Sequence, residues 1–201
     1  MHYRHVGSLY EARPGHSTEA RARCSASKVE RQSLAGLFKH GNARPEERLR
    51  VGESVCGSIL MLHAGAWAPV GSVARKALDN EIMALARAAV GANRTGGGHD
   101  RPFADVAREY GVQALDERLH VAHARYFRRC IVNGPELLWA LIEGTAFEKS
   151  WASETVAALR WLKRHCNLLS DMPDPLQGSE AWAELAAGPA ARWKHYVRFA
   201  G

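Results

Sequence analysis

Basic residues concentrate at the N-terminal end of this 201-residue chain. Residues 1–50 contain ten Lys or Arg and five Asp or Glu, so they carry +5 of the formal net charge of +6. A basic segment favours polyanions, above all the phosphates of nucleic acid. A solvated basic helix without a partner is the alternative interpretation. The candidate phosphate contacts in this segment are Lys28, Arg31, Lys39, Arg44, Arg48 and Arg50.

A second basic row accompanies a helix that the apolar spacing predicts over residues 114–132. Arg118, Arg125 and Arg129 fall beside the apolar stripe of this helix, where they could contact phosphates. They could equally cover apolar surface with their side-chain stems while the charge stays in water. The same two interpretations apply to a further cluster: Arg160, Lys163 and Arg164.

Aromatic residues offer a second mode of nucleic-acid contact, because bases stack on aromatic rings. Five tryptophans are candidates for it, but their helical spacing among Leu and Ala favours a place in the core instead. They are Trp139, Trp151, Trp161, Trp182 and Trp193.

The residue types needed for catalysis or metal binding do not occur in a recognisable pattern. The sequence contains no G-x-S-x-G, H-E-x-x-H or P-loop motif. His120 and His123 share one helix face, yet no third metal ligand lies nearby, so two surface histidines are the favoured interpretation. Asp171 and Asp174 flank a proline turn, which favours a capped turn over a cation site. We therefore expect no catalytic residue, no metal site and no cofactor.

The four cysteines indicate a reducing compartment. Cys24, Cys56, Cys130 and Cys166 lack the short spacing of a zinc site, and no secretory signal precedes them, so free buried thiols are expected. No apolar run approaches the roughly 18 residues of a membrane helix. These observations predict an intracellular protein without a membrane partner.

The elements that must position these residues are almost all helices. The predicted fold class is therefore all-α and multi-helical. Residues 3–10 are the exception, because they are predicted to form a short extended or strand segment at the N-terminus. The Gly-rich residues 92–101 predict a linker between a first unit, 1–91, and a second helical unit, 102–201. The predicted helices cover about 17–40, 45–63, 73–90, 102–110, 114–132, 135–144, 150–169, 179–187 and 189–199.

Residues 103–127 also have the pattern of a helix-turn-helix. A short helix, the turn at Gly111-Val112 and a longer helix follow one another as in DNA-reading motifs. Any tight helical pair that stops at a glycine gives the same pattern, so this interpretation ranks third.

A set of short motifs in a fixed order gives the most specific signal. Tyr3-Arg4-His5-Val6-Gly7-Ser8 is followed by helical segments and then by Ser58, Leu60, His63-Ala64-Gly65 and Trp67. This order resembles the region just after the polymerase palm in non-LTR (LINE-type) retrotransposon reverse transcriptases. Leu62-His63 stands where that family usually has an aromatic residue. Residues 114–142 resemble the helical segment that follows the thumb in the same proteins.

The resemblance implies structural roles for the N-terminal segment. Tyr3, Gly7 and Ser8 would belong to the primer-grip strand, and residues 1–91 would form a thumb-like unit whose second helix is closed by Trp67. In the family, the thumb holds the template–primer duplex through its backbone. The catalytic aspartates lie upstream in an F/Y-A-D-D hairpin, and this motif does not occur here, so the Mg²⁺ ligands of the polymerase would be missing.

These observations together predict a truncated reverse-transcriptase-like protein. We expect it to bind RNA/DNA hybrid or duplex weakly and without sequence preference, with no polymerase chemistry of its own and no small-molecule substrate. The alternative is a helical protein-interaction module or a non-functional retroelement remnant. A helix-turn-helix DNA-binding protein is the third possibility.

Overall fold

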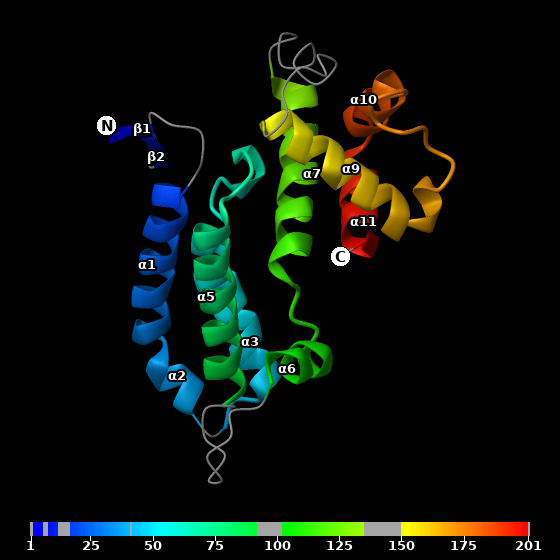
Figure 1. Ribbon diagram of the computed structural model, residues 1–201. Coiled ribbons are helices and arrows are strands. Elements are labelled where there is room, and N and C mark those ends of the chain that lie inside the picture. The colour runs from blue at the N-terminus through cyan, green and yellow to red at the C-terminus, as the bar shows by residue number, and fades with distance from the viewer. Residues whose placement is uncertain are drawn as a thin grey trace. The chain divides into compact units, whose positions relative to one another are not determined.

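A computed structural model describes residues 2–5, 8–11, 17–40, 42–91, 102–134 and 150–200, with side chains from residue 17 onward. The described chain is all-α and multi-helical, as the sequence predicts (Figure 1). At its N-terminal end, strands β1 (His2–His5) and β2 (Ser8–Glu11) form an antiparallel hairpin. The segment predicted to be extended therefore pairs with itself, Tyr3 opposite Tyr10.

The chain divides into two compact units. Unit 1 comprises residues 1–62 and 70–115, and unit 2 comprises residues 63–69 and 116–201. The linker predicted at 92–101 lies outside the described residues, as does the whole of the helix predicted at 135–144. No helix in the described ranges combines the length and the apolar character needed to cross a bilayer.

Unit 1 is built around the long helix α5. This helix runs through residues that the sequence predicts to be helical, and it ends at Gly91, whose φ of 75° suits a residue without Cβ. Gly111, with a φ of 64°, closes α6 in the same way. The helices of unit 1 are α1 (Ser17–Ser33), α2 (Ala35–Lys39), α3 (Pro45–Gly52), α4 (Ser58–Leu60), α5 (Ser72–Val90) and α6 (Phe103–Tyr110).

Two of the predicted helices of unit 1 are interrupted. The helix predicted at 17–40 breaks at Leu34, so that α2 is a separate short helix that buries Phe38. The helix predicted at 45–63 contains a π-helical turn, Glu53–Gly57, and ends at Leu60. His63 follows with a φ of 62°, a left-handed conformation that no helix can continue.

A close approach of helices explains the small residue at the end of α3. A Cβ on Gly52 would lie 2.9 Å from Leu85 Cδ1 and 3.2 Å from Phe38 Cζ. The absence of a side chain therefore lets α3 pack directly against α5 and the Phe38 ring. Leu49 of α3 and Leu78 and Ile82 of α5 are buried as well.

Unit 2 has a core of aromatic and aliphatic side chains. Phe127, Leu159, Leu162 and Trp182 form its centre. The helix predicted at 150–169 ends earlier, at His165, and a 3₁₀ turn, Asn167–Leu169, follows. Its helices are α7 (Leu115–Asn133, whose first residue belongs to unit 1), α9 (Trp151–His165), α10 (Ser179–Ala187) and α11 (Ala190–Ala200).

The short segment 63–69 is part of the unit 2 core. A Cβ on Gly65 would lie 2.6 Å from Tyr126 Cβ and still closer to the Ala122 carbonyl oxygen, so only glycine fits against α7. The Trp151 indole donates a 2.7 Å hydrogen bond to the Gly65 carbonyl and meets the Tyr126 ring edge-on at 5.6 Å. Gly65 thus joins α7 and the start of α9.

Candidate nucleic-acid interface

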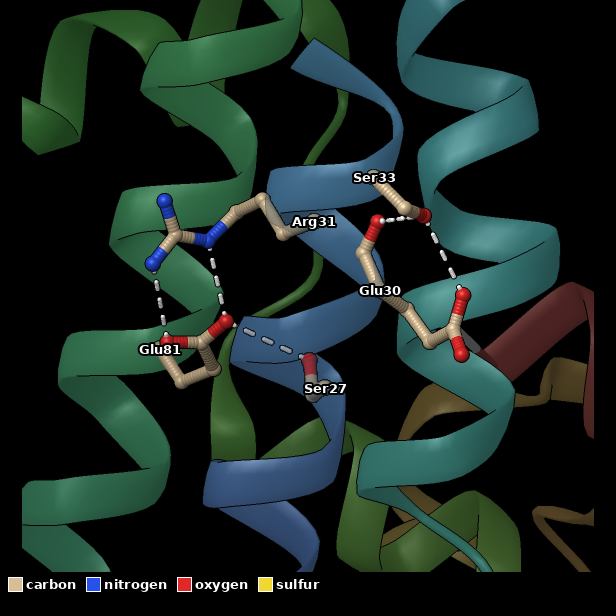
Figure 2. A network of polar contacts seen from close by, with 5 residues as sticks. All are labelled: Ser27, Glu30, Arg31, Ser33 and Glu81. Carbon is tan, nitrogen blue, oxygen red and sulfur yellow. Dashed lines mark hydrogen bonds and ion pairs between the residues drawn. The ribbon is translucent and has the colours of Figure 1, made fainter.

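Arg31 is held by a carboxylate on a neighbouring helix. Its Nε and Nη2 donate to Glu81 on α5 over 3.0 and 3.3 Å, and Ser27 Oγ donates to the same carboxylate over 3.3 Å (Figure 2). The side chain of Glu81 is only 9% exposed. A phosphate contact by Arg31 would have to break this pair and leave a buried carboxylate without its cation.

Two more of the N-terminal candidates also contact the protein itself. Arg44 forms a 2.7 Å ion pair with Glu47 at the start of α3, and this pair raises the pKa of Arg44 and lowers that of Glu47. Arg48 Nη1 donates a 2.7 Å hydrogen bond to the carbonyl oxygen of Phe38, which lies near the end of α2. Arg44 is exposed and can exchange its partner for a phosphate, whereas the half-buried Arg48 satisfies a backbone acceptor.

The remaining three candidates in unit 1 project into solvent. Lys28 on α1, Lys39 on α2 and Arg50 on α3 are all exposed. In the ranges that the structure describes, no carboxylate lies within ion-pair distance of any of them. These three cations are therefore available to an external anion without the loss of an internal contact.

The arginines of α7 differ in exposure. Arg125 and Arg129, one turn apart, are exposed, whereas Arg118 is half-buried and engaged with other groups of the chain. Of the apolar stripe predicted on this helix, Leu115, Leu119 and Cys130 are buried, and Ala122 and Tyr126 are half-buried. Only the pair Arg125 and Arg129 is thus open to a phosphate on this helix.

The basic cluster of α9 is partly committed to the turn that follows it. Arg160 binds Asp174 through two hydrogen bonds, 2.7 and 3.0 Å long, and these bonds lower the pKa of Asp174. Asp174 Oδ1 also accepts a 3.0 Å hydrogen bond from the Leu176 amide. Asp174 therefore stabilises a turn, as the sequence favours, while Arg164 remains exposed.

The tryptophans that the structure describes contribute to the core. Trp182 and Trp193 are buried and donate to the carbonyls of Pro173 and Ala124 over 3.0 and 3.2 Å, and Trp161 is also buried. Trp151 is half-buried against Gly65. Trp139 lies outside the described residues. The core interpretation is thus confirmed for the other four.

The thiols and histidines form no group that could hold a metal in the described part of the chain. The interpretation of two surface histidines is wrong for His123, which is 2% exposed. Cys24, Cys56, Cys130 and Cys166 are free, and all but the half-buried Cys24 are buried. Burial, with the nearby charge of Glu81, raises the pKa of Cys24 to about 11. Such a thiol stays protonated at neutral pH and is a poor nucleophile.

The residues singled out by the family resemblance belong to the N-terminal hairpin and to the 63–69 segment. Tyr3 and Ser8 belong to the β1–β2 hairpin, and Gly7 is outside the described residues. Trp67 is 2% exposed within unit 2. The two helices of the possible helix-turn-helix belong to different units: α6 lies in unit 1, and α7 lies in unit 2 apart from its first residue, Leu115.

One surface was missed by the sequence reasoning. Lys194, His195, Arg198 and Phe199 share the outer side of α11 and line an open hollow of about 560 Å³. The sequence does indicate this surface. Its residues recur at helical spacing, as Lys194 and Arg198 do, and no acidic residue follows Glu184.

No protein-family model, curated protein or solved structure matches this chain. The resemblance to LINE-type reverse transcriptases therefore stays a prediction.

Proposed function

We propose that the protein binds the phosphate backbone of RNA/DNA hybrid or duplex nucleic acid, weakly and without sequence preference. The observation that carries the proposal is the set of exposed cations on three helices of unit 1: Lys28, Lys39 and Arg50. Each has no ion-pair partner in the described ranges. Contacts of this kind position a protein on nucleic acid but read no bases. Dissociation constants of roughly 10⁻⁴–10⁻⁶ M at physiological salt are typical of such binding.

The proposal includes the absence of nucleotide addition by this chain. Polymerisation requires a pair of carboxylates that hold two metal ions, and the sequence contains no F/Y-A-D-D motif to supply them. A primer-extension assay with Mg²⁺ tests this part of the proposal. Extension by the pure protein would contradict it.

Fluorescence anisotropy with a labelled RNA/DNA hybrid, measured over a salt series, tests the binding. Each phosphate neutralised on duplex releases about 0.9 counterion. The triple variant Lys28→Gln/Lys39→Gln/Arg50→Gln should therefore make the plot of log affinity against log salt shallower by about 2.7.

A matched variant controls for the loss of three positive charges. Arg21→Gln/Lys76→Gln/Arg108→Gln removes three exposed cations outside the proposed contacts and should leave the slope nearly unchanged. Equal effects of the two variants would contradict a local interface. If the wild-type protein does not bind even at low salt, the result would favour a helical protein-interaction module instead.

A further inference from the structure

Helix α11 has two distinct faces. Trp193 and Val197 are buried in the unit 2 core. The Trp193 indole donates to the Ala124 carbonyl, and its ring lies 6.0 Å from that of Phe127 on α7. The helix is therefore fixed in rotation about its own axis, and this orientation determines which side chains face solvent.

The outward face combines charge with an aromatic surface. Ala191, Lys194, His195, Arg198 and Phe199 follow the spacing of one helix face and line the open hollow. Phe199 is 67% exposed, and its ring lies 4.3 Å from that of His195 at an angle of 48°. An exposed phenyl ring braced by a neighbouring ring is not explained by the packing of the core.

The charge of this helix is uncompensated. Arg192, Lys194 and Arg198 are exposed, and α11 contains no Asp or Glu. No ion pair to any of the three is formed within the residues that the structure describes. By contrast, Arg160 of the same unit is bound to Asp174. The outer face of α11 is thus complementary to a polyanion.

We propose that this face of α11 binds single-stranded nucleic acid. Lys194 and Arg198 contact phosphates, and an unpaired base stacks on the exposed ring of Phe199. Aromatic stacking beside a basic surface is the common mode of single-strand binding, and it needs a base that is free of its own duplex. The site uses none of the residues assigned to duplex binding in unit 1, so it extends the proposed function to a second form of nucleic acid.

The composition of the face favours this occupant over a lipid surface. A membrane-surface helix presents several large apolar side chains along one side. On the outer face of α11 only Phe199 is a large apolar residue, with Ala191 beside it. Binding of phosphatidylserine vesicles and of poly-glutamate is therefore measured beside that of the oligonucleotides.

The experiment measures anisotropy of labelled 12-nucleotide oligo(dT) and oligo(rU) with the full chain. Phe199→Ala should weaken binding about 5- to 150-fold, the range measured for loss of one base–aromatic stack. Phe199→Tyr, which keeps the ring, should bind like the wild-type protein. Lys194→Gln/Arg198→Gln should reduce the salt slope by about 1.4, since each phosphate of a single strand releases about 0.7 counterion.

Three controls separate this site from the rest of the protein. Val29→Ala removes an apolar side chain of unit 1 that is 60% exposed, and it should leave oligonucleotide binding unchanged. Because Phe199 is exposed, Phe199→Ala should retain the wild-type melting temperature by circular dichroism. Its binding to the RNA/DNA hybrid should also be unchanged, so the failure of this site and that of the duplex site are distinguishable.

Three outcomes would overturn the proposal. The first is no binding of either oligonucleotide by the wild-type protein at low salt. The second is equal affinity of the wild-type and Phe199→Ala proteins. The third is an effect of Phe199→Ala that appears only with phosphatidylserine vesicles or with poly-glutamate, which would assign the face to a membrane or to an acidic protein.

Discussion

At the scale of single residues, the partner of a basic side chain decides what that side chain can do. Arg31 and Lys28 lie one turn apart on α1 and look alike in sequence. Arg31 is bound to Glu81, whereas Lys28 is exposed and has no ion-pair partner in the described ranges. The formal charge of a segment therefore overstates the charge that it can offer to nucleic acid.

The Arg31–Glu81 pair should be a local determinant of stability in unit 1. Arg31→Met should lower the free energy of unfolding by about 2 kcal/mol, because it leaves Glu81 buried without its cation. The double variant Arg31→Met/Glu81→Leu should recover most of this loss, since no uncompensated charge remains. Urea denaturation of the two variants measures both effects.

The exposed pair Arg44–Glu47 serves as the control for that experiment. Arg44→Met should have little effect on the urea midpoint, because a solvent-exposed ion pair contributes little to stability. If Arg31→Met unfolds at the wild-type midpoint as well, the contact between α1 and α5 does not stabilise the protein in solution.

Asp174 should contribute to the dependence of stability on pH. Its bonds to Arg160 hold the pKa of the carboxyl below the ordinary value of 3.8, so the folded state keeps it ionised where the unfolded state takes up a proton. The stabilisation is present above this value and is lost as pH falls through the lower pKa of the folded state. Asp174→Asn should therefore show a smaller fall of the melting temperature below pH 4 than the wild-type protein.

Asp171→Asn provides the comparison, because Asp171 lies in the same turn and is exposed. The asparagine at position 174 keeps an oxygen that can accept from the Leu176 amide, so the turn itself is preserved. If the melting temperatures of the wild-type protein and of Asp174→Asn fall equally as the pH is lowered, the Arg160 contact has no effect on stability.

At the scale of elements, glycines mark where backbone segments approach one another. Gly65 lies against α7 with no room for a methyl group, whereas Gly36 in α2 has no heavy atom within 4 Å of an added Cβ. The two positions have the same residue type but opposite environments. Their substitution by alanine should therefore have effects of opposite sign.

Gly65→Ala should destabilise unit 2 by about 1–3 kcal/mol, because the new methyl group would force the 63–69 segment away from α7. Gly36→Ala should stabilise the protein by about 0.4–1 kcal/mol, since alanine restricts the unfolded chain and fits the helix. Thermal unfolding followed by circular dichroism measures both. Loss of stability in Gly36→Ala, or none in Gly65→Ala, would contradict the packing described.

At the scale of the whole molecule, helical periodicity predicted the elements better than their interruptions. The helices predicted at 73–90 and 102–110 end at Val90 and Tyr110 as expected, because Gly91 and Gly111 are local stop signals. The breaks at Leu34 and Glu53–Gly57 were not predicted, because the apolar periodicity continues through both positions and no glycine or proline stands at Leu34.

The candidate site was predictable only in part for the same reason. Sequence gives the positions of Lys and Arg, but whether each meets a carboxylate depends on residues 14 or 50 positions away, as for Arg160 with Asp174 and Arg31 with Glu81. The outer face of α11 was within reach of sequence reasoning. Its four residues follow helical spacing, but in net charge the last 51 residues, at +1, stand out far less than residues 1–50, at +5.

The division of the chain has a consequence for any attempt to dissect the protein by truncation. The backbone enters unit 2 after Leu62, returns to unit 1 after Pro69, and leaves it again after Leu115. No single cut therefore separates the two cores. A fragment that starts at residue 116 lacks Gly65, the acceptor of the Trp151 indole, and also the buried Trp67. Deletion from the C-terminus to Leu115 would keep every residue of unit 1, but deletion from the N-terminus would remove 63–69 from unit 2 before it had removed all of unit 1.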